Sequence, residues 1–422
     1  MSAKDTKSPI IGPLSRRSVL MGGAALTASL FAPKFLRAAD FPTATVNTTG
    51  LAVTDSTVTI GILHSITGTM AISETGSVQA EKLAISQINA MGGILGRKIE
   101  FIQEDGASDW PTFAEKAKKL LVNDKVASVM GCWTSASRKA VLPVFEQYNG
   151  FLYYPTFYEG LEQSPNVIYT GQEATQQIIA GIDWVTRTKG AKSFYLLGSD
   201  YIWPRTSNKI ARKHIEKLGL KVVGEEYYPL GHTQFNSVIN KIRLKKPDVI
   251  YAIVVGGSNV AFYKQLKAAG IDMTKEKPIL LTISVTEDEI RGIGGENIEG
   301  AYACMKYFQS LDNPNNKDFV AAFKKMWGED MVIGDVTQAA YLGPWLWKAA
   351  VEKAGSFDVD KVRAASPGIE FTKAPEGYVK VHENHHLWSK TRVGRAKVNG
   401  QYEVVFETAD LVEPDPFPAG YQ

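Results

Sequence analysis

Short apolar runs alternate along the chain with longer segments in which apolar residues recur every three or four positions. The short runs predict buried strands, and the longer segments predict amphipathic helices. Strands are predicted over 58–63, 98–103, 126–130, 151–154, 193–197, 221–228, 249–255 and 279–283. Helices are predicted over 79–90, 111–121, 138–148, 178–188, 205–218, 235–244 and 260–269. This alternation indicates an α/β fold whose parallel sheets are covered by helices on both faces.

The order of strands and helices runs twice, near 56–170 and again near 172–300, which predicts two similar lobes. The length of the chain also suits two domains better than one. Polar and aromatic residues follow the predicted strands in both halves, namely Ser65, Thr67, Trp133, Ser135, Tyr154, Thr156, Tyr201, Trp203, Gly256 and Ser284. Ligands of parallel sheets bind beyond the carboxyl ends of the strands. Two facing sets of such ends therefore predict a ligand cleft between the lobes.

Two stretches of the first half, 131–141 and 153–160, combine hydroxyl groups with aromatic rings. Ser135 and Thr156 can each donate and accept a hydrogen bond, while Trp133 and Tyr154 offer flat faces to a planar group. Such a site suits a small neutral solute, for example urea or a short-chain amide. The sequence contains neither a nucleophile–base pair nor a metal-ligand cluster beside these residues. It therefore favours binding over catalysis and predicts no cofactor and no metal.

The start of the chain predicts export. Arg16-Arg17 precede an apolar segment that ends near Phe31, and Ala38-Ala39 follow. This order is typical of a twin-arginine signal, here over residues 1–39, and predicts a periplasmic protein. The apolar segment of about 14 residues is too short to span a bilayer as a helix. No cysteine follows it, so a lipid anchor is not expected.

The same segment distorts the charge balance. Residues 1–39 contain six basic residues and one acidic residue, so their net charge is +5. The formal net charge of the whole chain is +3, and the remaining residues therefore carry a net charge of −2. No basic surplus remains to favour binding of nucleic acid.

One motif would favour an enzyme. His382-Glu383-Asn384-His385-His386 matches the H-E-x-x-H pattern of zinc proteases, which requires a helix so that both histidines share one face. The flanking residues 376–381 and 388–398 instead have the composition of strands, so we predict a turn here. Of the two cysteines, Cys132 and Cys304, the first ends an apolar run and is expected to be an inert buried thiol.

The run from Ile88 to Arg97 resembles the signature of the amino-acid and amide branch of the periplasmic binding proteins. The stretches 131–139, 154–160 and 198–205 and the tail Pro414-Asp415-Pro416 are similar to those of urea and short-chain amide receptors of ABC transporters. They are also similar to those of the amide-sensing regulator of amidase operons. The resemblance covers roughly 56–418. It implies a type I periplasmic-binding-protein fold, with two Rossmann-like lobes joined by a three-strand hinge.

The resemblance also implies domain bounds and partners. The first lobe would comprise 56–171 with 302–384, the second 172–301 with 385–412, and a C-terminal tail 413–422 would follow. A membrane permease and an ATPase of the ABC type are the implied partners.

Residue by residue, the family's ligand positions fall on this sequence as follows. Ser135 and Thr156 match hydroxyl residues that meet the ligand, and Trp133 and Tyr154 match aromatic walls of the first lobe. Tyr201 and Trp203 match aromatic residues that close from the second lobe, Ser284 falls near a hydroxyl position, and Gly256 lies in a loop similar to that of the amide sensor. Departures from the urea receptors at Thr156-Phe157 and at 254–258 leave urea and acetamide-like amides both open.

Several functions therefore remain open. The leading one is an extracytoplasmic receptor that delivers urea or a short-chain amide to an ABC-type permease. Alternatives are an amide sensor that signals to a partner protein, and a receptor for branched-chain amino acids. The ammonium group of an amino acid would need a carboxylate, for which Asp105, Asp109 and Asp200 are the candidates.

Overall fold

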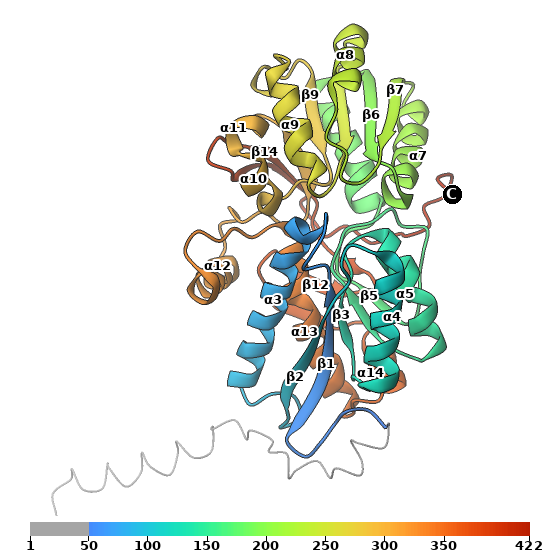
Figure 1. Ribbon diagram of the computed structural model, residues 1–422, viewed down its shortest axis with the longest axis vertical. Coiled ribbons are helices and arrows are strands. Elements are labelled where there is room, and N and C mark those ends of the chain that lie inside the picture. Colours follow the sequence, from blue (N-terminus) through green and yellow to red (C-terminus); the bar gives the residue numbers. More distant parts are fainter. Residues whose placement is uncertain (1–49) are drawn as a thin grey trace, which may run out of the picture.

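The computed structural model describes residues 50–422, and the predicted export signal over 1–39 lies outside this range. Two lobes lie one above the other in Figure 1, and each is built on its own large sheet. Within residues 50–422, no helix is both long and apolar enough to cross a membrane.

The first lobe contains a five-stranded parallel sheet in the order β2-β1-β3-β4-β5. Its strands are β1 (Thr57–His64), β2 (Lys98–Asp105), β3 (Val129–Gly131), β4 (Leu152–Tyr154) and β5 (Val167–Tyr169). Its helices are α3 (Ala71–Ala90), α4 (Trp110–Lys118), α5 (Ser135–Gln147), α12 (Pro314–Trp327), α13 (Asp335–Ala354) and α14 (Val359–Ala365). A small antiparallel sheet of β11 (Glu370–Ala374), β12 (Gly377–Val381) and β13 (Leu387–Trp388) completes it.

Both faces of this sheet are covered, which is why its strands are almost continuously apolar. Ile60 and Ile62 of β1 belong to the core that includes α3 and α13. Gly61 faces the other way and lies against Leu120, where a Cβ atom would come within 2.9 Å of the leucine side chain.

The second lobe contains a seven-stranded sheet in the order β15-β14-β10-β9-β8-β6-β7. Its strands are β6 (Ser193–Ser199), β7 (Lys221–Tyr228), β8 (Val249–Ile253), β9 (Ile279–Thr282), β10 (Tyr302–Met305), β14 (Arg392–Ala396) and β15 (Tyr402–Glu407). Its helices are α6 (Ala180–Lys189), α7 (Ile202–Lys217), α8 (Asn236–Lys245), α9 (Ser258–Ala268), α10 (Glu287–Ile293) and α11 (Gly295–Ile298). Figure 1 shows this sheet between α7 and α9. Only β14 and β15 are antiparallel to their neighbours.

The chain crosses between the lobes three times, after β5, after β10 and after β13. These crossings differ from the bounds expected from sequence. Residues 302–305 were placed in the first lobe, but β10 pairs with β9 and β14 of the second. His386 pairs with Tyr169 of the first lobe, so the third crossing also comes a few residues later. Local composition predicts a strand, but not which sheet completes its hydrogen bonds.

Side chains link the three crossings. Lys306, just after β10, donates from Nζ to the carbonyl of Thr170 (2.7 Å) and is paired with Glu376 (2.6 Å). Thr391 donates to the carbonyl of Gln176 at 2.5 Å. These bonds fix how the connecting segments lie side by side at the base of the cleft.

Candidate functional site

The carboxyl ends of strands from both lobes meet at a cluster of aromatic rings. Trp133 follows β3, and Phe157 follows β4 with its ring centre 6.0 Å from that of Trp133. From the second lobe, Trp203 in the first turn of α7 contacts both rings, at 6.5 Å from Trp133 and 5.4 Å from Phe157. Tyr201 lies 6.4 Å from Trp203. The structure thus brings Trp133, Tyr201 and Trp203 together, as predicted, and adds Phe157.

Four buried polar atoms of these residues and of Thr156, the chain neighbour of Phe157, have no hydrogen-bond partner among residues 50–422. They are Trp133 Nε1, Thr156 Oγ1, Tyr201 OH and Trp203 Nε1. An unpaired buried donor or acceptor costs about 1–3 kcal/mol, and a bound polar solute would remove that cost. Burial raises the pKa of Tyr201 well above its usual value, with nearby charges of Glu159 and Glu74 adding to the effect, so its hydroxyl stays neutral. Three donors and one Thr hydroxyl are therefore free to meet a polar solute.

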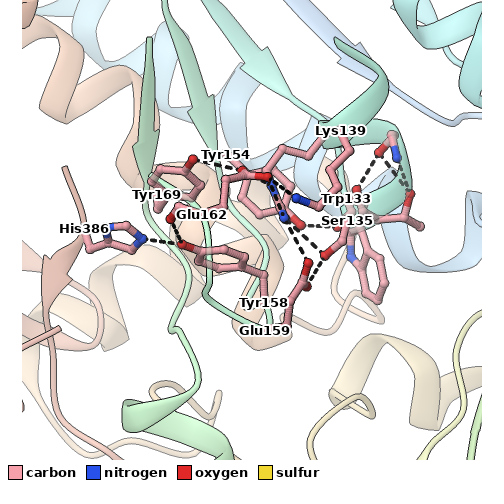
Figure 2. A network of polar contacts seen from close by, with 12 residues as sticks. Trp133, Ser135, Lys139, Tyr154, Tyr158, Glu159, Glu162, Tyr169 and His386 are labelled. Atoms are coloured by element: carbon pink, nitrogen blue, oxygen red, sulfur yellow. Dashed lines mark hydrogen bonds and ion pairs between the residues drawn. The ribbon is translucent and has the colours of Figure 1, made fainter. Parts of the chain in front are cut away.

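The hydroxyl of Ser135, at the start of α5, is already engaged. It donates to Glu159 Oε2 (2.6 Å) and accepts from Arg138 Nη1 (3.1 Å). Figure 2 shows Ser135 and Glu159 within a larger polar network that also includes Tyr154, Tyr158 and Glu162. A serine hydroxyl has one proton and two lone pairs. One lone pair of Ser135 thus remains, and toward any further partner this residue acts as an acceptor.

Arg138 is the centre of that network. Its side chain is fully buried and lies over the rings of Tyr154 (4.8 Å) and Tyr158 (4.4 Å). It forms ion pairs with Glu159 (3.2 Å) and Glu162 (2.7 Å). Burial alone would raise the pKa of Glu162, but the Arg138 guanidinium outweighs it and lowers that pKa to about 2. Arg138 is therefore neutralised within the protein, and it holds Ser135 in position.

Sequence reasoning missed Arg138, although its position offered a signal. It lies three residues after Ser135 on α5, so the two side chains share a helix face. Tyr154 likewise has its hydroxyl proton committed, since it donates to the carbonyl of Trp133 at 2.7 Å. The guanidinium group of Arg138 lies over the ring of Tyr154. Tyr154, which was expected to form an aromatic wall of the ligand site, therefore contacts Arg138 with this ring face.

The H-E-x-x-H motif forms the turn between β12 and β13, as predicted. His386 stacks on Tyr169 (4.3 Å, 2°), and its Nε2 lies 2.5 Å from the hydroxyl of Tyr158. Burial lowers the pKa of His386 to about 3, so the ring is neutral. His382 instead contacts Glu413 of the tail, at 3.2 Å. The two histidines thus contribute to different contacts.

Two predicted residues of the second lobe lie where they make protein contacts. Ser284 donates from Oγ to the carbonyl of Val254 at 2.8 Å, which ties the ends of neighbouring strands together. Gly256 has a φ of +62°, and a Cβ atom here would come within 3.0 Å of the carbonyl oxygen of Thr69. Its neighbour Gly257 donates to the same carbonyl at 3.4 Å. Gly256 therefore lies where the second lobe touches the start of α3.

A second contact joins the lobes at α10. Asp288 Oδ2 accepts hydrogen bonds from the amide of Gly334 (2.8 Å) and the hydroxyl of Thr337 (2.9 Å), both in the first lobe. Burial, helped by the charge of Glu289, raises the pKa of Asp288 to about 7. The two contacts thus join the lobes beside the first turns of α3.

The three aspartates considered for an ammonium group are all engaged elsewhere. Asp105 accepts from the amides of Ile66 and Ala107, Asp109 caps α4, and Asp200 pairs with Arg205 at 2.5 Å. A carboxylate that sequence reasoning missed lies in the first turn of α3. Glu74 on α3 is fully buried, and its Oε1 has no hydrogen-bond partner among the described residues.

The reason for missing Glu74 is the boundary of α3. A helix was predicted from residue 79, but it begins at Ala71. Its first three turns bury Ser73, Glu74, Ser77 and Glu81. Because this inner face is polar, the apolar periodicity on which the prediction relied is absent there.

Elsewhere, a surface cavity of about 790 Å³ lies at the amino-terminal edge of the second sheet, lined among others by Lys189, Arg243 and Lys277. It is at the opposite end of the strands from the aromatic cluster. Cys132 and Cys304 are free and buried, one in each lobe.

Comparisons with known proteins agree with this architecture. Residues 58–422 match a family model described as a periplasmic binding protein domain. The leucine-, isoleucine-, valine-, threonine- and alanine-binding protein of Pseudomonas aeruginosa is 29% identical over 340 residues, covering 78% of this chain and 87% of that protein. A limonene hydroxylase of Geobacillus stearothermophilus is 33% identical over 124 residues, which is 29% of this chain and 23% of that protein.

Among solved structures, the solute-binding protein of an ABC transporter from R. palustris in complex with benzoate has a similar fold. Its TM-score is 0.76 at 21% identity, and the superposition covers 85% of this chain and 98% of that one. This likeness confirms the two-lobed α/β fold predicted from the sequence.

Proposed function

Because this chain belongs to the periplasmic binding protein family, we propose that it is the receptor for urea or a short-chain aliphatic amide. Its family is one of solute-binding components that work with ABC permeases, and the family is not enzymatic. The ligand is held between the two lobes, at the aromatic cluster of Trp133, Phe157 and Trp203.

One observation carries the proposal. Polar atoms without a protein partner, from both lobes, gather at a single buried cluster of rings. The two indole N–H groups and the hydroxyl of Tyr201 can donate to a carbonyl oxygen. Thr156 Oγ1 can accept from an N–H group or donate as well. Urea and small amides offer both a carbonyl and an amino group on a flat frame that fits between rings.

Charge favours a neutral ligand over a carboxylate. The cation beside the cluster, Arg138, is already paired with Glu159 and Glu162. A carboxylate in the same place would add a third negative charge to this buried network. That burial costs several kcal/mol unless a cation compensates.

Size limits how tightly such a ligand binds. At a ceiling of ~1.5 kcal/mol per heavy atom, the contacts of urea supply about 6 kcal/mol, a Kd of roughly tens of μM. Tighter binding must draw on contacts between the lobes. The bonds from Asp288 to Gly334 and Thr337 are of this kind, and they touch no ligand.

The remaining parts of the proposal follow from the start of the chain and the family. Residues 1–39 direct twin-arginine export to the periplasm, and the closed receptor delivers its ligand to an ABC permease with its ATPase. Export favours transport over the alternative role of an amide sensor acting on a partner protein. A second candidate ligand is a branched-chain amino acid, which the 29% identical amino-acid receptor favours.

Calorimetry on residues 40–422 tests the proposal. The panel contains urea, formamide, acetamide, propionamide and leucine. Binding of urea or an amide supports the proposal, and binding of leucine alone refutes it.

Thr156→Val should weaken amide binding about tenfold, the value of one neutral hydrogen bond. The matched control is Thr186→Val on α6, which removes another buried hydroxyl without a partner but far from the rings. Equal affinities of the two variants would exclude this pocket.

A further inference from the structure

The first three turns of α3 bury a polar face at the carboxyl end of β1. Glu74 and Glu81 lie on this face and are both buried against His64, at the end of β1. Burial lowers the pKa of His64, but the two carboxylates outweigh it and raise that pKa to about 9. The ring is therefore positively charged at neutral pH.

The two oxygens of Glu74 have different surroundings. Oε2 accepts from the amide of Ser65 at 2.7 Å and lies 3.4 Å from Nδ1 of His64. Oε1 is buried and meets no hydrogen-bond donor in the described part of the chain. The bonds to Oε2 fix the carboxylate in one orientation, so Oε1 is held in place as an acceptor.

Glu74 lies toward the site and not toward the outer end of the helix. Its Oε2 is bonded to Ser65, which directly follows β1. Leu63 of the same strand accepts a hydrogen bond from the amide of Cys132, the neighbour of Trp133, at 2.8 Å. The start of α3 is moreover in contact with the second lobe, since Gly257 donates to the carbonyl of Thr69.

We propose that Glu74 is a specificity-determining residue whose Oε1 accepts a hydrogen bond from the amino group of the bound amide. The assignment rests on the proposed function and adds the orientation of the ligand. The NH₂ group faces acceptors of the first lobe, which are Glu74 and the remaining lone pair of Ser135. The carbonyl oxygen faces the indole N–H groups of Trp133 and Trp203.

With acceptors at one end of the ligand and donors at the other, the site would bind an amide more tightly than the carboxylate of the same shape. Acetate differs from acetamide in having an oxygen and a negative charge where acetamide has its NH₂. Placed in the same orientation, acetate would bring that oxygen against Oε1 of Glu74, with no proton between them. Like charges in a buried site repel, whereas an N–H donor to a carboxylate forms a strong hydrogen bond.

Glu74→Gln tests the assignment, with Glu81→Gln as the matched control. Both remove one carboxylate beside His64 from the same buried helix face. Each carboxylate has one oxygen without a partner among the described residues, but Glu81 lies about 10 Å further along the helix at ~1.5 Å per residue. Only the first substitution therefore alters the acceptor at the start of α3. The Kd values of acetamide and acetate are measured by calorimetry at pH 7.5 for both variants and the wild-type protein. Since both ligands are measured on one preparation, any loss of folded protein cancels from their ratio.

In Glu74→Gln, acetamide should bind about tenfold to a hundredfold more weakly, the value of one hydrogen bond to a charged group. The preference for acetamide over acetate should narrow by at least about tenfold. In Glu81→Gln both quantities should stay within about threefold of wild type. Equal changes in the two variants, or no change in either, would overturn the role of Glu74 while leaving amide binding intact. Failure of the wild-type protein to bind any amide would overturn the proposed function itself, and this assignment with it.

Discussion

The charge of His64 should make the stability of this protein fall with rising pH in a defined range. His64 is fully buried, with Nε2 at 2.9 Å from Glu81 and Nδ1 at 3.4 Å from Glu74. Its pKa is raised from its usual 6.5 to about 9 because the two carboxylates outweigh burial. The folded protein therefore binds this proton more tightly than the unfolded chain does. The resulting stabilisation is complete below about pH 6.5 and is lost as the pH rises to about 9.

The size of the effect follows from the difference between the two pKa values. At about 1.4 kcal/mol for each pH unit, it is on the order of 3 kcal/mol. This is a large part of the about 5–15 kcal/mol by which folded proteins are stable. The buried carboxyl groups of Asp288 and Glu173, whose pKa values burial raises to about 7, change stability mainly below pH 7. Burial also raises the pKa values of Glu287 and Glu289, so the contribution of His64 is taken from the difference between the wild-type protein and a variant without the imidazole.

The measurement is unfolding by guanidinium chloride at pH 6, 7, 8 and 9, for wild type and His64→Gln. Urea is avoided because it is a candidate ligand. Glutamine keeps the ring's polar character without its charge, so the variant should be less stable at pH 6 and the gap should shrink by about 3 kcal/mol toward pH 9. An NMR titration of the His64 ring gives the pKa directly. A constant gap between the two proteins, or a measured pKa of 6.5 or below, would refute the reasoning.

Two further predictions concern the cleft. Ser135→Ala should lower the stability of the ligand-free protein by about 1 kcal/mol, because it removes the hydrogen bonds with Glu159 and Arg138, whereas Thr156→Val should leave it nearly unchanged. Scanning calorimetry without ligand separates the two, and equal melting temperatures would contradict the assigned contacts. Closure should take up a proton at Asp288, whose pKa is about 7 in the closed protein. Ligand affinity should accordingly decrease as the pH rises from about 4 to 7 and then level off. Asp288→Asn should remove this trend in calorimetric titrations, and an unchanged pH profile would exclude a role of the Asp288 hydrogen bonds in closure.

Much of the fold could be predicted because it depends on local pattern. Strand β7 has the predicted bounds, and β1, β2, β6 and β9 differ from theirs by at most two residues at an end. Buried parallel strands are continuous apolar runs, and covering helices repeat their apolar residues at helical spacing. Polar and aromatic residues that follow strands mark the ligand edge of a parallel sheet, so the sequence could place Trp133, Tyr201 and Trp203 near one another, while their contact with a ligand stays a prediction.

Only the tertiary structure determined which donors and acceptors of each polar group are left unpaired within the protein. Ser135 can be read from the sequence, but only the fold brings Glu159 close enough to accept the proton of its hydroxyl group. Toward a ligand, Ser135 can therefore act as a hydrogen-bond acceptor. The sequence also contains Glu74, but only the fold buries this carboxylate beside His64 with one oxygen unpaired. Hydropathy describes one residue and its near neighbours along the chain. Hydrogen bonding and charge balance depend on residues brought together from distant segments, and these determine which solute the cleft accepts.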